Sequence, residues 1–273
     1  MKVGTRILSC LAAGVLLITA FSAQGKKKML SASEISITVV FDNYAYRKDL
    51  KDSWGFACVV RGAEKTILFD TGGDGAILMG NLEKLKIDPQ GVDAVVLSHA
   101  HGDHTGGLNA FLRANPRVEV YAPRSFPESF KAGVKVTGAK LVEVSGALEI
   151  CDGVWSTGEA GKGIIEESLA LRTDRGLVVI TGCAHPGIVL ILEKAKSLLE
   201  GNDILLAMGG FHLRSESEAG LKKIINRFKE LGVQRAGPSH CSGDRTRELF
   251  KKEYGEDFIK IGVGYMVQFG RMP

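Results

Sequence analysis

Short apolar runs alternate with stretches of helical periodicity from about residue 35 to the end of the chain, and this alternation restricts the fold most. Runs such as 35–41 and 94–97 are bounded by glycine or charged turns, which predicts strands. Stretches such as 188–199 carry apolar residues at helical spacing, which predicts helices between the strands. A chain of this kind is expected to fold as an α/β protein whose helices cover sheets.

The pattern occurs twice. We expect strands at 35–41, 56–60, 66–69, 94–97 and 118–121, and a second series at 140–144, 168–172, 177–181, 204–208, 234–236 and 258–267. We expect helices at 76–85, 104–112, 188–199, 216–231 and 245–254, while the proline-broken stretch 123–137 carries no clear pattern. Two similar halves packed sheet against sheet with helices outside form a four-layer αββα sandwich. Since no low-complexity linker separates them, residues 30–273 are expected to be one domain.

An apolar run at residues 7–23 stands between basic residues, with Lys2 and Arg6 before it and lysines 26–28 after it. This arrangement is typical of a secretory signal peptide, and the run is also just long enough for an uncleaved membrane anchor. We therefore expect residues 1–25 to be a signal peptide or N-terminal anchor. The protein would be exported to the periplasm or beyond, with membrane contact only through an uncleaved segment.

The charge of the chain is balanced. It has 35 Lys and Arg residues against 31 Asp and Glu, so the formal net charge is +4, and both signs are mixed along the sequence. This composition does not favour nucleic acid as a partner, and we expect a small-molecule substrate. The 45% hydrophobic residues suffice for a large core, which excludes a disordered tail or a disulfide-stapled miniprotein.

Beyond the N-terminal segment four cysteines remain, Cys58, Cys151, Cys183 and Cys241. Outside the cytoplasm they could form disulfides. However, Cys183 and Cys241 each lie beside a histidine-bearing motif, which suits metal chemistry better.

All six histidines lie at or near the ends of expected strands. They are His99, His101, His104, His185, His212 and His240. Because strand ends at one edge of a sheet converge in space, loops there can assemble a site from residues far apart in the sequence.

The strongest motif is the run from Ser98 to Gly107, which places three imidazoles and a carboxylate within six residues. His99 and His101 are spaced to point the same way and share one metal ion. The turn at Gly102 lets Asp103 and His104 face a neighbouring position. The motif therefore predicts a metal site.

This HxHxDH run is typical of the metallo-β-lactamase superfamily, which the chain resembles over essentially its whole length after the N-terminal segment. Residues 69–73 resemble the first motif of that superfamily, whose Asp, here Asp70, supports the metal loop. The later motifs TGCAHPGI (181–188), GGFHL (209–213) and PSHCSG (238–243) resemble the branch named for dihydropterin-ribofuranosylaminobenzene-phosphate synthase, a transferase. Bacterial members of that branch are mostly metal hydrolases without assigned substrates.

The resemblance implies a set of ligands. His185 would complete a first site with His99 and His101, and His240 would join Asp103 and His104 at a second. Cys183 stands where the superfamily usually has an Asp that bridges two metals. A thiolate is a good zinc ligand but a poor bridge between hard ions, so Cys183 is either a ligand or a small buried residue.

Two positions depart from the pattern. The usual third-motif histidine is absent, which leaves Glu159, Glu166, Glu167 or no residue in its place. His212 has no standard counterpart among the ligands. It is expected to protonate a leaving group or to hold an anionic substrate oxygen, or else to be structural. Cys241 is interpreted as a packed neighbour of His240.

We expect one or two zinc ions, with iron or manganese as alternatives, to lower the pKa of a bound water toward 7. Asp103 would orient this water for attack on a carbonyl or phosphoryl centre. The sequence thus predicts a metal-dependent hydrolase of a small-molecule ester, phosphoester or lactone. The alternatives are a dihydropterin-type transferase and a non-hydrolytic redox or sensing protein.

Overall fold

The computed structural model describes residues 1, 29–200 and 203–270. The predicted signal peptide or anchor therefore lies outside the described residues, except for Met1. Within the described part of the chain, no helix is long and apolar enough to cross a membrane.

The first sheet has seven strands in the order β13-β1-β2-β3-β4-β5-β6. Its strands are β1 (Ser36–Phe41), β2 (Ala57–Arg61), β3 (Ile67–Phe69), β4 (Ala94–Val96), β5 (Glu119–Pro123), β6 (Lys140–Val144) and β13 (Met266–Gln268). The strands from β3 to β6 run parallel, whereas β13, β1, β2 and β3 pair antiparallel. The loops that follow β3 and β4 therefore leave the sheet at the same edge.

The second sheet has six strands in the order β12-β11-β10-β9-β8-β7. Its strands are β7 (Leu148–Cys151), β8 (Val154–Ser156), β9 (Leu169–Thr173), β10 (Gly176–Thr181), β11 (Ile204–Gly210) and β12 (Val233–Ser239). The last three run parallel, so the loops after them also gather at one edge.

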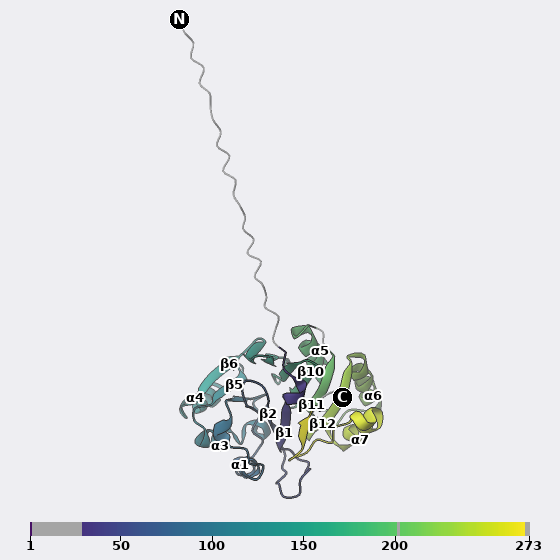
Figure 1. Cartoon of the computed structure of the whole chain (residues 1–273), viewed down its shortest axis with the longest axis horizontal. Helices are drawn as coiled ribbons and strands as arrows, with labels where there is room; N and C mark the ends of the chain where they lie inside the picture. Colours follow the sequence, from purple (N-terminus) through teal and green to yellow (C-terminus); the bar gives the residue numbers. More distant parts are fainter. Residues whose placement is uncertain (2–28, 201–202, 271–273) are drawn as a thin grey trace.

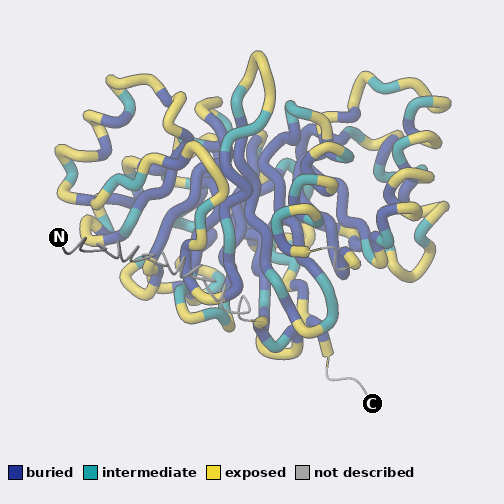
Figure 2. The backbone as a smooth tube through the Cα atoms, turned by 90° about the horizontal axis from the view of Figure 1, so that it is seen from above, coloured by how far each residue is buried: buried dark blue, intermediate teal, exposed yellow. Residues whose placement is uncertain are grey.

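The two sheets pack face to face, as the period-two alternation of their buried residues requires. In β2, Cys58 and Val60 point into the core between the sheets, which also contains Leu171 and Ile180 of the second sheet. Ala57 and Val59 point the other way, into a cluster under the outer helices. Figure 2 shows the strands as the buried centre of the molecule, with exposed residues toward the outside.

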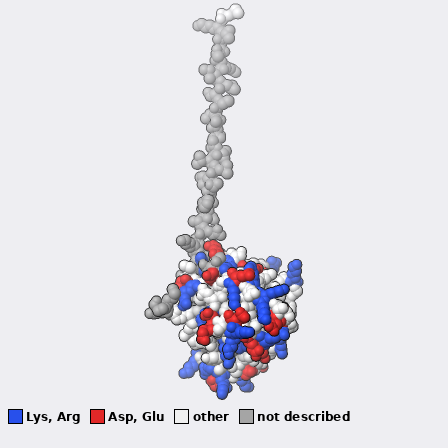
Figure 3. All heavy atoms as spheres, turned by 90° about the vertical axis from the view of Figure 1, so that its right-hand side faces the viewer, with Lys and Arg blue, Asp and Glu red and all other residues white. Residues whose placement is uncertain are grey.

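Helices cover both outer faces (Figure 1). The first face is covered by α1 (Gly75–Lys84), α3 (Leu108–Ala114) and α4 (Glu128–Lys135), and the second by α5 (Ile188–Leu198), α6 (Glu218–Glu230) and α7 (Asp244–Tyr254). Shorter helices are α2 (Gly102–Thr105), η1 (Ala32–Glu34), η2 (Pro89–Gly91), η3 (His240–Ser242) and η4 (Gly255–Asp257). The predicted αββα sandwich is confirmed. On the face in Figure 3, acidic and basic side chains are interspersed.

The division into halves differs from the prediction in two places. The strand at 140–144 was expected to begin the second half, but β6 pairs with β5 at the edge of the first sheet. The strand expected at 258–267 is only β13, and it pairs with β1 of the first sheet. Both errors arise because strand pairing is decided by contacts far apart in the sequence, which periodicity does not report.

Three elements were not predicted. The strands β7 and β8 form a short hairpin at the sheet edge, with a break in register between Glu149 and Cys151. The helix α4 begins after Pro127 inside the stretch that carried no clear pattern. Such short elements offer too few residues for a periodic signal.

Candidate metal centre

All six histidines do lie beyond strand ends. His99, His101 and His104 follow β4, and the other three follow β10, β11 and β12. These strands belong to both sheets, so the site is assembled from both halves at one edge of the sandwich.

Four backbone conformations at this edge are unusual. Asp70, Ala184, His212 and His240 have positive φ angles between 48° and 63°, a region that non-glycine residues rarely occupy. Only two other described non-glycine residues, Lys86 and Glu200, share this property. Strained backbone tends to collect at functional sites, where the surrounding structure holds it in place.

The first group consists of His99, His101 and His185, which each offer a nitrogen within 4.8 Å of the others. The His99 Nε2 atom lies 3.1 Å from His101 Nδ1. The His185 ring lies 4.7 Å from that of His99 and 5.0 Å from that of His101, centroid to centroid. The structure thus brings together the three residues predicted for the first site.

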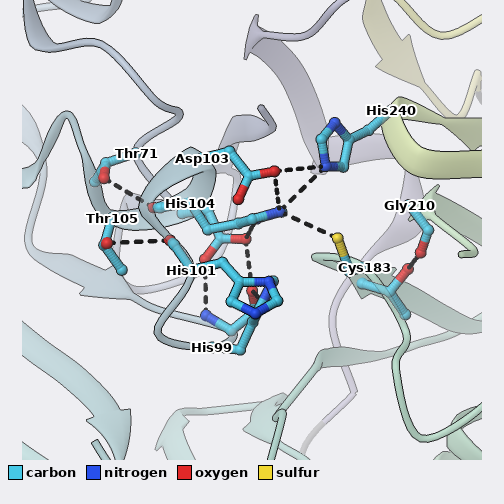
Figure 4. A network of polar contacts seen from close by, with 12 residues as sticks. Thr71, His99, His101, Asp103, His104, Thr105, Cys183, Gly210 and His240 are labelled. Atoms are coloured by element: carbon cyan, nitrogen blue, oxygen red, sulfur yellow. Dashed lines mark hydrogen bonds and ion pairs between the residues drawn. The ribbon is translucent and has the colours of Figure 1, made fainter. Parts of the chain in front are cut away.

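The second group consists of Asp103, His104 and His240, again within 4.8 Å of one another. His240 Nε2 lies 3.3 Å from His104 Nε2 and 3.3 Å from Asp103 Oδ2. Figure 4 shows these side chains converging on one point, which the sulfur of Cys183 also faces. The structure thus also brings together the residues predicted for the second site.

The Nδ1 atoms of four histidines contact oxygen atoms outside the two groups. His104 Nδ1 lies 2.7 Å from Asp70 Oδ2, and His185 Nδ1 lies 2.9 Å from Glu166 Oε2. For His99 and His240 the partners are Ser98 Oγ and Asn43 Oδ1, each at 2.9 Å. Each Nδ1–H donates to its oxygen, so each Nε2 turns a lone pair into the site, as in histidines that bind metals.

These lone pairs have no proton to share. The two Nε2 atoms of His104 and His240 face each other at 3.3 Å, and both are acceptors in this tautomer. A cation between them would turn this repulsion into coordination. The chemistry of the donors therefore fits a metal ion.

The spacing of the donors fits as well. Tetrahedral zinc with bonds of about 2.0–2.3 Å holds its ligand atoms about 3.3–3.8 Å apart. From His104 Nε2, the distances to His240 Nε2 and Cys183 Sγ are both 3.3 Å, and the distance to Asp103 Oδ2 is 3.7 Å.

Cys183 lies between the two groups. Its sulfur lies within 4.8 Å of donor atoms of His99 and His104, and it forms a further cluster with His240 and Cys241. The described cysteines, Cys58, Cys151, Cys183 and Cys241, are all free thiols. The thiol of Cys241 donates to the carbonyl oxygen of Cys183 at 3.6 Å. Cys241 is thus a close neighbour of His240, as predicted, and it also contacts Cys183.

Burial and neighbouring groups shift the pKa values of several side chains at the site. Burial, together with the nearby His104, lowers the pKa of His99 to about 2, so its imidazole is neutral. Burial opposes ionisation of Asp103, but its place beside the imidazoles of His104 and His240 holds its pKa below the usual range. In the Cys183–Cys241 pair, the hydrogen bond from Cys183 lowers the pKa of Cys241.

None of the three candidate glutamates belongs to a metal-capable group among the described residues. Glu166 instead accepts hydrogen bonds from the backbone of residues 183–185 and from the His185 ring. Although burial opposes its ionisation, these bonds lower its pKa to about 2. Glu159 accepts from the backbone of Ser125, and Glu167 accepts from Ser156. Of the alternatives, the structure favours no glutamate ligand.

His212 follows β11 and lies beside the first group. Its ring centroid is 4.5 Å from that of His185, and it clusters with Cys183 and His185. Hydrogen bonding to Cys241 raises its pKa. A side chain that is exposed and close to the first group is suited to proton transfer.

Some residues at the site carried little or no sequence signal. Asn43, two residues after the end of β1, holds His240 through its side chain. Trp54 was missed, although its ring lies 4.7 Å from the His240 ring. The only sequence signal was Gly55, directly after Trp54, because a glycine allows the backbone to approach a neighbouring loop closely.

The chain belongs to the metallo-beta-lactamase superfamily, because the model of that family matches residues 55–201, which is more than half of the 273 residues. The fold and the histidine motif agree with this membership, and members of the family generally bind metal ions.

Within the superfamily, the chain is similar to 7,8-dihydropterin-6-methyl-4-(beta-D-ribofuranosyl)-aminobenzene-5'-phosphate synthase of Methanocaldococcus jannaschii, with 26% identity over 86% of this chain and 97% of the relative. It is also similar to the crystal structure of a metal-dependent hydrolase of the beta-lactamase superfamily, with a TM-score of 0.73 and 27% identity over 87% of this chain and 100% of the other. A metallo-beta-lactamase fold protein from Bacillus subtilis shares the fold at a TM-score of 0.65 and 14% identity, covering 86% of this chain and 99% of that protein.

Proposed function

We propose that this protein is a metal-dependent hydrolase that acts on a small-molecule ester, phosphoester or lactone. The observation that carries the proposal is the set of Nδ1–H contacts to Asp70, Ser98, Glu166 and Asn43, which turn the Nε2 atoms of four histidines inward. Lone pairs that face one another repel, and a cation bound between them removes that repulsion, so this arrangement is the one expected of a metal site.

The donors favour zinc. Neutral imidazoles suit zinc, and the nearby thiol of Cys183 suits zinc better than magnesium or calcium, which prefer oxygen ligands. Iron and manganese remain the alternatives to be tested. One or two such ions would supply a nucleophilic water at neutral pH and positive charge beside the reacting oxygen.

Two side chains of the protein would orient the water and supply a proton. The Asp103 side chain is 22% exposed and its Oδ2 faces His240, so its carboxylate can accept a hydrogen bond from the attacking water and orient it. His212, beside His185 and open to solvent, can donate a proton to the leaving group.

A transferase activity is the second candidate. It is favoured by the similarity to the dihydropterin synthase-type relative, which extends over 86% of this chain. The two candidates share the metal site and differ in whether water or another nucleophile attacks. An enzyme of the second kind would consume substrate slowly until an acceptor is added.

The test begins with the metal content of protein purified without added metal or chelator. Purified protein and a His101→Ala variant would then be assayed with 4-nitrophenyl acetate, bis(4-nitrophenyl) phosphate and a lactone. The expected result is metal-dependent turnover of at least one probe, and a loss of about 100-fold or more in His101→Ala. Lys140→Ala, on the exposed edge strand, is the matched control. Near-native turnover of His101→Ala after metal removal would contradict the proposal.

A further inference from the structure

Two hollows open beside the metal-capable groups, and they share a wall formed by Trp54 and Arg214. The first has a volume of about 420 Å³ and reaches His212 and Cys241. The second has a volume of about 310 Å³ and reaches His240. A molecule lying against this wall would therefore touch residues next to both groups.

The position of Trp54 beside the two hollows is fixed by the backbone of the next residue. The next residue, Gly55, has a φ angle of 140°, and a Cβ there would lie 2.4 Å from the carbonyl oxygen of Asp103. The glycine thus lets the loop press against the metal-binding loop. The indole, 46% exposed, stands with its centroid 4.7 Å from the His240 ring.

Arg214 is held from the other side. It follows β11 two residues after His212, and its side-chain stem packs on Gly243, where a Cβ would lie 3.0 Å from the Cα and Cγ atoms of Arg214. The guanidinium carbon lies 5.8 Å from the centroid of the Trp54 ring. This distance is within the range of a cation–π contact.

Arg214 has no carboxylate bound to its guanidinium in the described part of the chain. It makes no ion pair with a carboxylate within residues 29–200 and 203–270. Asp244, which lines the second hollow, accepts a hydrogen bond from the Tyr44 hydroxyl at 2.7 Å. Glu216 accepts hydrogen bonds from Ser217. A free guanidinium beside an exposed indole leaves room for a ligand with both an anionic group and a ring.

We propose that Trp54 and Arg214 form the specificity wall of the site and select a substrate that carries a planar ring and an anionic group about one ring width apart. The proposal rests on the proposed function and names its substrate class. The ring stacks on the Trp54 indole, and the carboxylate or phosphate pairs with the planar donors of Arg214. The reacting bond then points past His240 or His212 to the metal-capable groups.

Equilibrium binding tests this without any turnover. Three probes separate the two features: phenylphosphonate has a ring and an anion, methylphosphonate has only the anion, and benzyl alcohol has only the ring. Calorimetric titration of the protein as purified should give the tightest binding for phenylphosphonate, by about tenfold or more over each of the others.

Variants assign the preference to residues. Arg214→Ala should weaken phenylphosphonate binding about tenfold and leave benzyl alcohol unchanged. Trp54→Ala should weaken phenylphosphonate several-fold and leave methylphosphonate unchanged. Arg235→Ala is the matched control, because Arg235 also lies over an aromatic ring, that of Phe269, at 5.9 Å but lines neither hollow.

The outcomes separate this inference from the proposed function. If phenylphosphonate binds Arg214→Ala and Trp54→Ala as tightly as the unaltered protein, the anion is held by metal alone and the specificity wall is wrong. If binding depends on both residues but no ester or phosphoester is hydrolysed, the wall stands and the hydrolase proposal fails.

Discussion

The first group reaches solvent through His101, whereas the two histidines of the second group are enclosed and only its Asp103 is partly exposed. His101 is exposed and the His185 side chain is 9% exposed, while His104 and His240 are buried completely or nearly so. The first group contains only imidazoles, and the second adds a carboxylate and has the thiol of Cys183 in contact with His104. Catalytic zinc sites keep a position open, and structural sites close it. Under the proposed function, an ion at the first group would be the more open to substrate, and an ion at the second would lie beside it.

Asp70 connects the two groups, so its loss should have the largest effect. It accepts from His104 Nδ1 and from the backbone and hydroxyl of Ser98, which in turn holds His99. In Asp70→Asn, metal affinity should fall up to about 100-fold at both groups, and the unfolding free energy by about 3–5 kcal/mol. Metal content after dialysis and the melting temperature measure these effects. Asp93→Asn, just before β4, should change neither; an equal loss there would contradict the role of Asp70.

Residues that orient the histidines of one group should change the metal affinity of that group alone. Among the histidine rings, Glu166 contacts that of His185 and Asn43 contacts that of His240. We expect Glu166→Gln to weaken the ion at the first group about 10–100-fold, and Asn43→Ala to weaken only the ion at the second by about tenfold. Competition with a metal-binding dye resolves the two affinities. If either variant weakened both sites equally, the groups would be one site rather than two.

Cys183 should give the second group a spectroscopic signal when cadmium is bound there. Because its sulfur lies 3.3 Å from His104 Nε2, cadmium bound at the second group should show a thiolate-to-metal absorption band in the ultraviolet. The band should disappear in Cys183→Ala, and zinc affinity there should fall by about tenfold. Cys58→Ala, with its thiol buried in the core between the sheets, should keep the band. A band that persists in Cys183→Ala would make another thiol the ligand.

The last prediction concerns stability rather than metal binding, and it involves Glu167, directly after the Glu166 that supports the first group. Burial raises the pKa of Glu167 to about 8 from its ordinary 4.5. The folded state therefore holds this proton between pH 4.5 and 8 while the unfolded state has lost it, so stability should fall as pH rises through that window. The slope is at most about 1.4 kcal/mol per pH unit.

Glu167→Gln removes this titration. Its melting temperature should match that of the unaltered protein at pH 5 and exceed it by several degrees at pH 8. Glu159→Gln, at a carboxylate that accepts from the Ser125 backbone, is the control. Equal pH slopes in the unaltered protein and Glu167→Gln would contradict the buried acid.

The sequence predicted the sandwich and the grouping of the histidines, because both depend on local patterns. The spacing in the HxHxDH motif and the position of each histidine after a strand were sufficient to predict that the six histidines lie at one edge of the sandwich. The residues that orient the histidines were harder to find. Glu166 was considered as a ligand, yet it lies behind His185, and only the three-dimensional contact reveals that role. Likewise, the pairing of β13 with β1 depends on residues far apart in the chain.

That pairing has a consequence for how the protein is made. β13 hydrogen-bonds to β1, and the loop after β1 supplies Asp42 and Asn43 to Ser239 and His240. β1 can pair with the nearby β2 early, but its other edge stays unpaired until β13 exists, and contacts of such long sequence separation form late in folding. A growing chain could hold an ion on residues 99–104, but not in the enclosed pair. Loading of the second position would thus require that the chain has been made at least as far as His240.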